Sequence, residues 1–234
     1  MHMKKYKILK DLVGFSTIKD KQNKEIINYI ENILREKDFK TEHKGKNLIM
    51  SYGKNPTLGF LGHTDTVEYI EGWDTNPFTL TEKNNKLYGL GACDMKAGIA
   101  AILEAIIETD LTKIKNGIKL YFTHDEERTF CGVNELIKKE KFPDFMIFGE
   151  PTYNEILIGC KGLLVCDVYF KGKKAHSSNP DKGISANLNA VRFLYELEQV
   201  YLMNIKNEIN EHIEKQSYDR LVMQYKELIA KKCL

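Results

Sequence analysis

The chain has 234 residues, enough for one sizeable hydrophobic core or for one domain with a smaller appendage. With 35 Lys+Arg against 33 Asp+Glu its net charge is +2, which argues against binding to nucleic acid or a membrane surface. Five scattered cysteines form no Cys-x-x-Cys pair, and the sequence has neither an apolar leader nor an apolar run of about 18 residues. We therefore expect a cytoplasmic protein with reduced thiols.

The first half of the chain alternates between helical and extended patterns. Residues 22–38 carry apolar side chains at helical spacing, which predicts an amphipathic helix. Short apolar runs bounded by glycine predict strands at 47–52 and 57–61. Residues 79–88 predict a hairpin, because Asn84-Asn85 at its centre tolerates positive φ.

The same alternation continues with a helix at 96–109, a strand at 118–123, a helix at 134–139 and a strand at 145–148. It predicts an α/β fold, in which helices cover both faces of a largely parallel mixed sheet. Beyond residue 160 the pattern changes. A β-rich run at 163–170 precedes a helix from about Ser185, and the polar stretch 204–234 has a helical pattern.

Chemistry-bearing side chains follow three of the predicted strands. His63 and Asp65 come directly after the strand at 57–61, where ligands gather in open α/β sheets. Asp65 could fix the second nitrogen of a metal-bound His63 imidazole. Taken alone, the pair is better explained as a surface-loop histidine with a turn aspartate.

Acidic residues at three further points are ambiguous one by one. Asp94 ends a Gly-rich turn and begins a helix, so it is either an N-cap or a carboxylate that bridges two metal ions. Glu126 and Glu127 follow the strand at 118–123, where one could bind a metal and its neighbour accept a proton, or both could belong to a solvated loop. Glu150 lies in a Glu-Pro turn. Together these carboxylates and His63 form the ligand set that suits zinc in a hydrolytic site.

The motifs in this order resemble the M20 metallopeptidase family. The resemblance covers most of residues 1–200 and is carried by these segments: Gly62-His63-Thr64-Asp65, Trp73-Asp74-Thr75-Asn76-Pro77-Phe78, Tyr88-Gly89-Leu90-Gly91-Ala92-Cys93-Asp94-Met95-Lys96, Asp125-Glu126-Glu127, Gly149-Glu150-Pro151-Thr152 and Gly172-Lys173-Lys174-Ala175-His176-Ser177-Ser178-Asn179-Pro180. It implies a zinc-peptidase-like αβα sandwich and one or two zinc ions, for which cobalt could substitute. The substrate would be a small N-acyl amino acid.

The resemblance also assigns roles to single residues. It implies that His63 and Glu150 bind one zinc, that Asp94 bridges, and that Glu127 binds the second zinc. Glu126 would be the general base and Asp65 would support His63. The family has a cis peptide bond after the bridging aspartate, which implies one at Asp94–Met95.

The resemblance places His176 in the lid, where it would polarise the scissile carbonyl. It implies a catalytic domain at 1–160, a partial lid at 161–203 that could form a homodimer, and a C-terminal helix at 204–234. Most of the lid strands of the family have no counterpart in the pattern, and Asn207 stands where the last zinc ligand, a histidine, is expected. We therefore expect a truncated lid and a second zinc site that is incomplete unless His212 or water replaces the missing ligand.

Two readings of the function remain open. The first is a zinc amidase in which a metal-bound hydroxide attacks an N-acyl amide, most like the acetylornithine deacetylases of arginine biosynthesis. Succinyl-diaminopimelate desuccinylases and other M20 aminoacylases are the nearest alternatives. The second reading is a zinc-binding remnant without turnover.

Overall fold

The structure is a computed structural model that describes residues 6–153, 155–159 and 166–205. Described residues up to 155 belong to one compact unit, and those from 156 to 205 belong to a second. The first unit contains all the metal ligands proposed above, and the second contains His176. The predicted domain limits at 160 and 203 stay predictions, and the helix expected at 204–234 lies almost wholly outside the described residues.

A five-stranded sheet in the order β1-β2-β6-β3-β7 forms the centre of the first unit. Its strands are β1 (Lys40–Lys44), β2 (Asn47–Tyr52), β3 (Leu58–His63), β6 (Ile118–Thr123) and β7 (Phe145–Phe148). β3 pairs in parallel with β6 and β7, whereas β2 pairs antiparallel with β1 and β6. Every strand except β2 therefore runs in the same direction, which confirms the largely parallel mixed sheet.

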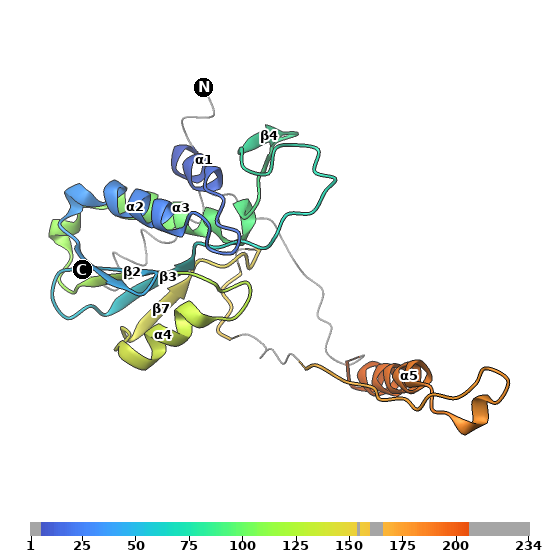
Figure 1. The fold of residues 1–234 in the computed structure, drawn as a ribbon. Helices are drawn as coiled ribbons and strands as arrows, with labels where there is room; N and C mark the ends of the chain where they lie inside the picture. Colours follow the sequence, from blue (N-terminus) through green and yellow to red (C-terminus); the bar gives the residue numbers. More distant parts are fainter. Residues whose placement is uncertain (1–5, 154, 160–165, 206–234) are drawn as a thin grey trace. The chain divides into compact units, whose positions relative to one another are not determined.

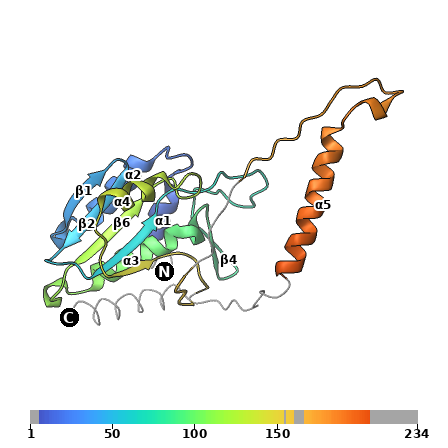
Figure 2. The ribbon, with the colours of Figure 1, turned by 90° about the horizontal axis from the view of Figure 1, so that it is seen from below.

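Helices cover both faces of this sheet (Figure 1). They are α1 (Lys7–Gly14), α2 (Asn23–Ile33), α3 (Ala97–Glu108) and α4 (Cys131–Lys139). The first three share a buried cluster with Leu120 and Phe122 of β6, whereas α4 packs Leu136 against Tyr121 of the same strand. Since successive strand residues point to opposite faces, this alternation builds the αβα sandwich. Figure 2 views the sheet from below, with β1 at one edge.

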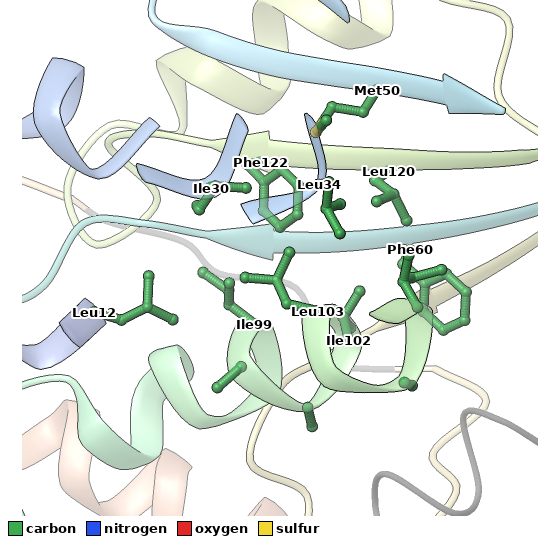
Figure 3. Packing of buried hydrophobic residues seen from close by; sticks show 14 of the residues in the cluster. Leu12, Ile30, Leu34, Met50, Phe60, Ile99, Ile102, Leu103, Leu120 and Phe122 are labelled. Atoms are coloured by element: carbon green, nitrogen blue, oxygen red, sulfur yellow. The ribbon is translucent and has the colours of Figure 1, made fainter. Parts of the chain in front are cut away.

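The main core lies between α1–α3 and the sheet, and Figure 3 shows its packing. Leu12 of α1, Ile30 of α2 and Leu103 of α3 are fully buried there, as are Phe60 and Leu120 of the sheet. Helix α3 contributes most, because its Ala, Ile and Leu residues let it lie close to β3. Burial of each large side chain of this kind contributes about 1.5–3 kcal/mol.

Strands β2, β6 and β7 have the predicted limits, and β3 extends two residues further than expected, to His63. The hairpin is confirmed as β4 (Thr81–Lys83) and β5 (Lys86–Tyr88), with φ of 53° at Asn84 and 58° at Asn85. Helix α4 begins three residues before the predicted start at Asn134. Helix α1 and strand β1 have no counterpart among the predictions. Short 3-10 turns lie at Arg35–Lys37, Leu111–Lys113 and Pro180–Lys182.

The second unit contains helix α5 (Ala186–Ile205) and an isolated antiparallel bridge between Lys173 and Ile184. Residues 166–170 of the predicted β-rich run pair with no strand among the described residues, and 163–165 lie outside them. Throughout the described part of the chain, no helix is both long enough and apolar enough to cross a bilayer.

Glu140 follows α4 and connects this helix to two strands of the sheet. Its carboxylate side chain is 6% exposed and accepts hydrogen bonds from the ammonium groups of Lys44 and Lys119. Burial alone would raise the pKa of Glu140, but these two cations outweigh it and hold the pKa below its ordinary value. The pair of ion pairs therefore joins β1 and β6 to the end of α4.

We expect Glu140→Gln to lower the free energy of unfolding by about 2–4 kcal/mol, since it leaves two part-buried ammonium groups without their carboxylate. A lowered folded pKa means that the stabilisation is complete above the unfolded pKa of glutamate, about 4.3, and is lost as pH falls through the folded pKa. Urea titrations between pH 3 and 7 measure this. The parent and the variant should converge at low pH, and an equal difference at every pH would contradict the account.

Candidate metal centre

Three neighbouring parallel strands deliver acidic or imidazole side chains to one edge of the sheet. His63 is the last residue of β3, Glu126 and Glu127 follow β6, and Glu150 follows β7. Because β3 pairs in parallel with both β6 and β7, their carboxyl ends meet at this edge. The predicted gathering of residues far apart in sequence is therefore found in the fold.

Asp94 reaches the same edge from a π-helical turn, Ala92–Lys96, which leads into α3. It is not an N-cap, because the N-cap of the turn is Gly91 and that of α3 is Lys96; Asp94 lies inside the turn, with a φ of −117° and a ψ of 103°. The Asp94–Met95 peptide bond is cis, as the resemblance implied. From this turn the Asp94 carboxylate reaches the His63 imidazole.

The His63 imidazole is the centre of the cluster and is only 1% exposed. Its Nε2 lies 3.1 Å from Asp94 Oδ1 and 3.9 Å from both Glu126 Oε2 and Glu150 Oε1. Its Nδ1 lies 3.1 Å from the backbone carbonyl oxygen of Asp65. With Nδ1 donating to that carbonyl, Nε2 is the nitrogen left to bind a metal ion.

Asp65 organises the other side of the site. Its Oδ1 lies 3.5 Å from His63 Nδ1, and its two carboxylate oxygens accept the backbone N–H groups of Glu126 and Glu127, each at 3.1 Å. Burial would raise the pKa of Asp65, but these donors outweigh it and hold the pKa below its ordinary value. One buried carboxylate thus fixes the His63 ring and the loop that carries both glutamates.

Within the described residues, two groups of side chains offer ligand atoms that all lie within 4.8 Å of one another. The first, His63 with Asp94 and Glu150, contains the residues expected around the first zinc. The second joins His63 with Glu126 and Glu127, whereas the expected second site joined Glu127 with Asp94. The proposed first site is therefore compact in this structure. In the second group Glu127 lies with His63 and Glu126, and not with Asp94 as expected.

The charges of the cluster are unbalanced without a cation. Burial would lower the pKa of His63, but the carboxylates of Asp65 and Asp94 outweigh it and raise the pKa to about 10. Burial also raises the pKa of Glu150 to about 7, and the neighbouring Asp94 and Glu126 carboxylates act in the same direction. Burial likewise raises the pKa of Glu126 and Glu127. A divalent cation would offset the repulsion between these neighbouring carboxylates and stabilise their ionised forms.

The donor set fits zinc. Imidazole nitrogen and carboxylate oxygen bind zinc at about 2.0–2.2 Å, so ligand atoms around one ion lie roughly 3–4 Å apart. The distances from His63 Nε2 to the Asp94 and Glu150 oxygens, 3.1 and 3.9 Å, are in that range. These three residues could therefore hold a divalent metal with little rearrangement.

His176 belongs to the second unit, so its proposed part in the site stays a prediction. Its ring is exposed, and its Nδ1 lies 2.8 Å from Ser178 Oγ and accepts the Ser178 backbone N–H at 3.3 Å. With Nδ1 as acceptor, a neutral ring carries its proton on Nε2. That nitrogen would then be the donor that an oxyanion role requires.

Two contacts beside the cluster were not predicted. His124 Nδ1 lies 3.0 Å from Asp20 Oδ2, which ties the loop after β6 to the loop before α2. Lys46 Nζ binds the same carboxylate oxygen at 2.9 Å. The residues of the first contact are 104 positions apart, so spacing could not reveal it; a polar histidine at the end of a buried strand was the only signal.

Residues 59–231 match the sequence profile of peptidase family M20/M25/M40. The chain belongs to this family. The match includes every predicted site residue, from His63 to His176. It confirms the expected family and assigns the chain to a group of metal-dependent hydrolases.

Curated relatives of the M20 chain include acetylornithine deacetylases. The protein of that name from Photorhabdus laumondii is 38% identical over 203 residues, which are 82% of this chain and 51% of that protein. The one from Pasteurella multocida is 37% identical over 202 residues, with shares of 82% and 52%. The chain thus spans about half the length of the curated relatives it matches.

Solved M20 structures share the fold at low identity. A tripeptidase from Staphylococcus aureus superposes with a TM-score of 0.56 at 20% identity, over 81% of this chain and 54% of that one. An M20 metallo-carboxypeptidase from Sulfolobus solfataricus gives 0.54 at 23% identity, over 64% and 37%. These likenesses confirm the zinc-peptidase-like sandwich.

Proposed function

We propose that this chain holds one or two zinc ions and hydrolyses the amide bond of an N-acyl amino acid, with N-acetylornithine as the preferred substrate class. The observation that carries the proposal is the compact group of His63, Asp94 and Glu150, whose ligand atoms lie within 4.8 Å of one another in an M20 chain. Identity of 38% to an acetylornithine deacetylase supports the choice of acyl group. The desuccinylase reaction is the nearest alternative.

Bound zinc would supply a Lewis acid and a source of nucleophilic water near neutral pH. His63, Asp94 and Glu150 would hold it, and Glu127 would contribute to a second ion. Glu126 is the proposed proton acceptor, because its carboxylate faces His63 Nε2 at 3.9 Å while its backbone N–H is fixed on Asp65. The same carboxylate can return the proton to the departing amine nitrogen.

Asp65 would hold the His63 ring and the Glu126 backbone in fixed positions relative to each other. A reaction that depends on proton transfer requires such positioning. His176 would donate from Nε2 to the oxygen of the scissile carbonyl as negative charge develops there. Dimerisation through the second unit, which the resemblance implied, is a further proposal that the oligomeric state in solution would test.

A calorimetric zinc titration followed by an amine-release assay tests the proposal. We expect at least one tight zinc site, its loss in Asp94→Ala, and its retention in Asp144→Ala, which changes an exposed aspartate at the opposite end of β7 from Glu150. N-Acetylornithine should be hydrolysed faster than N-succinyl-diaminopimelate. Tight zinc binding without release of amine from either substrate would instead support a zinc-binding domain without turnover.

A further inference from the structure

The side chain of Met95 contacts the backbone of His63, a proposed metal ligand, and has no assigned part in the metal centre. Met95 follows Asp94 in the chain and is 0% exposed. Its thioether sulfur, Sδ, accepts the backbone N–H of His63 at 3.1 Å. A thioether is a weak acceptor, so its use for a buried backbone donor at a metal ligand calls for an explanation.

The register of the sheet explains why this N–H needs a partner. β7 pairs with β3 as far as Phe148, opposite Leu61, and the Gly149 N–H still donates to the Leu61 carbonyl at 3.1 Å. In a parallel ladder the next bond would run from the His63 N–H to the Gly149 carbonyl. That carbonyl instead lies against Gly98 of α3, where an added Cβ would come within 1.9 Å of its oxygen. Met95 Sδ takes its place as acceptor.

The end of the same side chain packs against the two neighbouring strand ends. A Cβ added at Gly62 would lie 3.2 Å from Met95 Cε, and one added at Gly149 would lie 3.0 Å from it. Gly62 precedes His63 and Gly149 precedes Glu150. One buried side chain therefore touches the segments that deliver His63 and Glu150, and it is bonded through the backbone to Asp94.

We propose that Met95 is a positioning residue of the metal centre, whose thioether fixes the end of β3 so that the His63 imidazole meets Asp94 and Glu150. The proposal rests on the metal-binding part of the proposed function. Packing alone does not explain why methionine stands at this position. Leucine has a similar volume and would fill the same space, but it offers no acceptor to the His63 N–H. The sulfur supplies the hydrogen-bond acceptor that the interrupted β3–β7 ladder lacks.

Met95→Leu tests this, with Met50→Leu as the matched control, since Met50 is a buried methionine of β2 in the main core and 1% exposed. In the metal-free protein, the His63 amide signal should shift and its hydrogen exchange should accelerate in Met95→Leu only. Cobalt affinity should fall about 10-fold, the lower end of the range for residues that orient metal ligands, and the visible cobalt absorption should change. The thermal midpoint of metal-free Met95→Leu should lie below that of Met50→Leu, because the buried His63 N–H loses its acceptor.

Each result is decisive. A His63 amide and a cobalt spectrum that match the parent in Met95→Leu would overturn the proposal, as would equal changes in Met50→Leu. A parent that binds no cobalt would refute the metal site, and with it the proposed function. Met95 would then still be judged by the His63 amide: no shift overturns the hydrogen bond, and a shift supports it.

Discussion

Glu126→Gln is expected to lower kcat for an N-acetyl amino acid about 10³-fold, within the range of about 10²–10⁴ for loss of a general base. Glutamine keeps the size of the side chain and the Glu126 N–H bond to Asp65, but it cannot accept a proton. Since Glu126 is proposed as the base and not as a ligand, zinc affinity should stay within about threefold of the parent. Both kcat and kcat/KM should fall together, which is the signature of an interaction made in the transition state.

The measurement is steady-state kinetics of the zinc-loaded chain beside calorimetry on the same preparations. Glu82→Gln, an exposed glutamate of the β4–β5 hairpin, is the control and should behave as the parent. Glu126 also clusters with His63 and Glu127 in the second candidate group. A parallel loss of zinc affinity in Glu126→Gln would therefore assign this residue to the metal and contradict its role as the base.

Gly98→Ala should disrupt the site through the backbone of Gly149, the residue before Glu150. A Cβ at Gly98 would lie 1.9 Å from the Gly149 carbonyl oxygen and 2.8 Å from the Gly149 carbonyl carbon, so backbone must move. Overpacking of this kind costs about 1–3 kcal/mol or more, against a gain of about 1 kcal/mol for alanine over glycine in a helix. Because Gly149 precedes Glu150, the displacement reaches a proposed metal ligand directly.

We expect Gly98→Ala to lower the thermal midpoint and to weaken zinc binding about 100-fold, the upper end of the range for residues that orient metal ligands. Gly14→Ala is the matched control, because a Cβ at this last residue of α1 would meet nothing within 4 Å. Differential scanning fluorimetry and zinc calorimetry give both quantities. Equal zinc affinities in the two variants would show that the close approach of α3 to β7 does not set the position of Glu150.

The sequence predicted the elements that show a short apolar run or a clear helical repeat. Strands β2 and β6 are apolar and central, and their predicted limits match the structure. β1 was missed because Lys40–Lys44 is a charged edge strand with little burial, so no alternation marks it. α1 was missed although Leu9, Leu12 and Val13 have helical spacing, because the helix is only eight residues long.

The proposed ligands could be selected from the sequence because each follows a predicted strand or a Gly-rich turn, and the family motifs fix their order. The geometry that supports them was beyond the sequence. The anchoring of two consecutive N–H groups by Asp65 joins residues 61 and 62 positions apart, and the Met95 thioether contacts a backbone N–H 32 positions away. Such contacts depend on where strands end, which hydrophobic patterns locate least well.

The central claim is that His63, Asp94 and Glu150 hold one metal ion. Crystals grown with zinc, measured on both sides of the zinc absorption edge, test it most directly. The account predicts an anomalous peak about 2.0–2.2 Å from His63 Nε2 and from a carboxylate oxygen of each of the two acids. A zinc-saturated crystal with no peak there, and with these side chains turned away from one another, would contradict it.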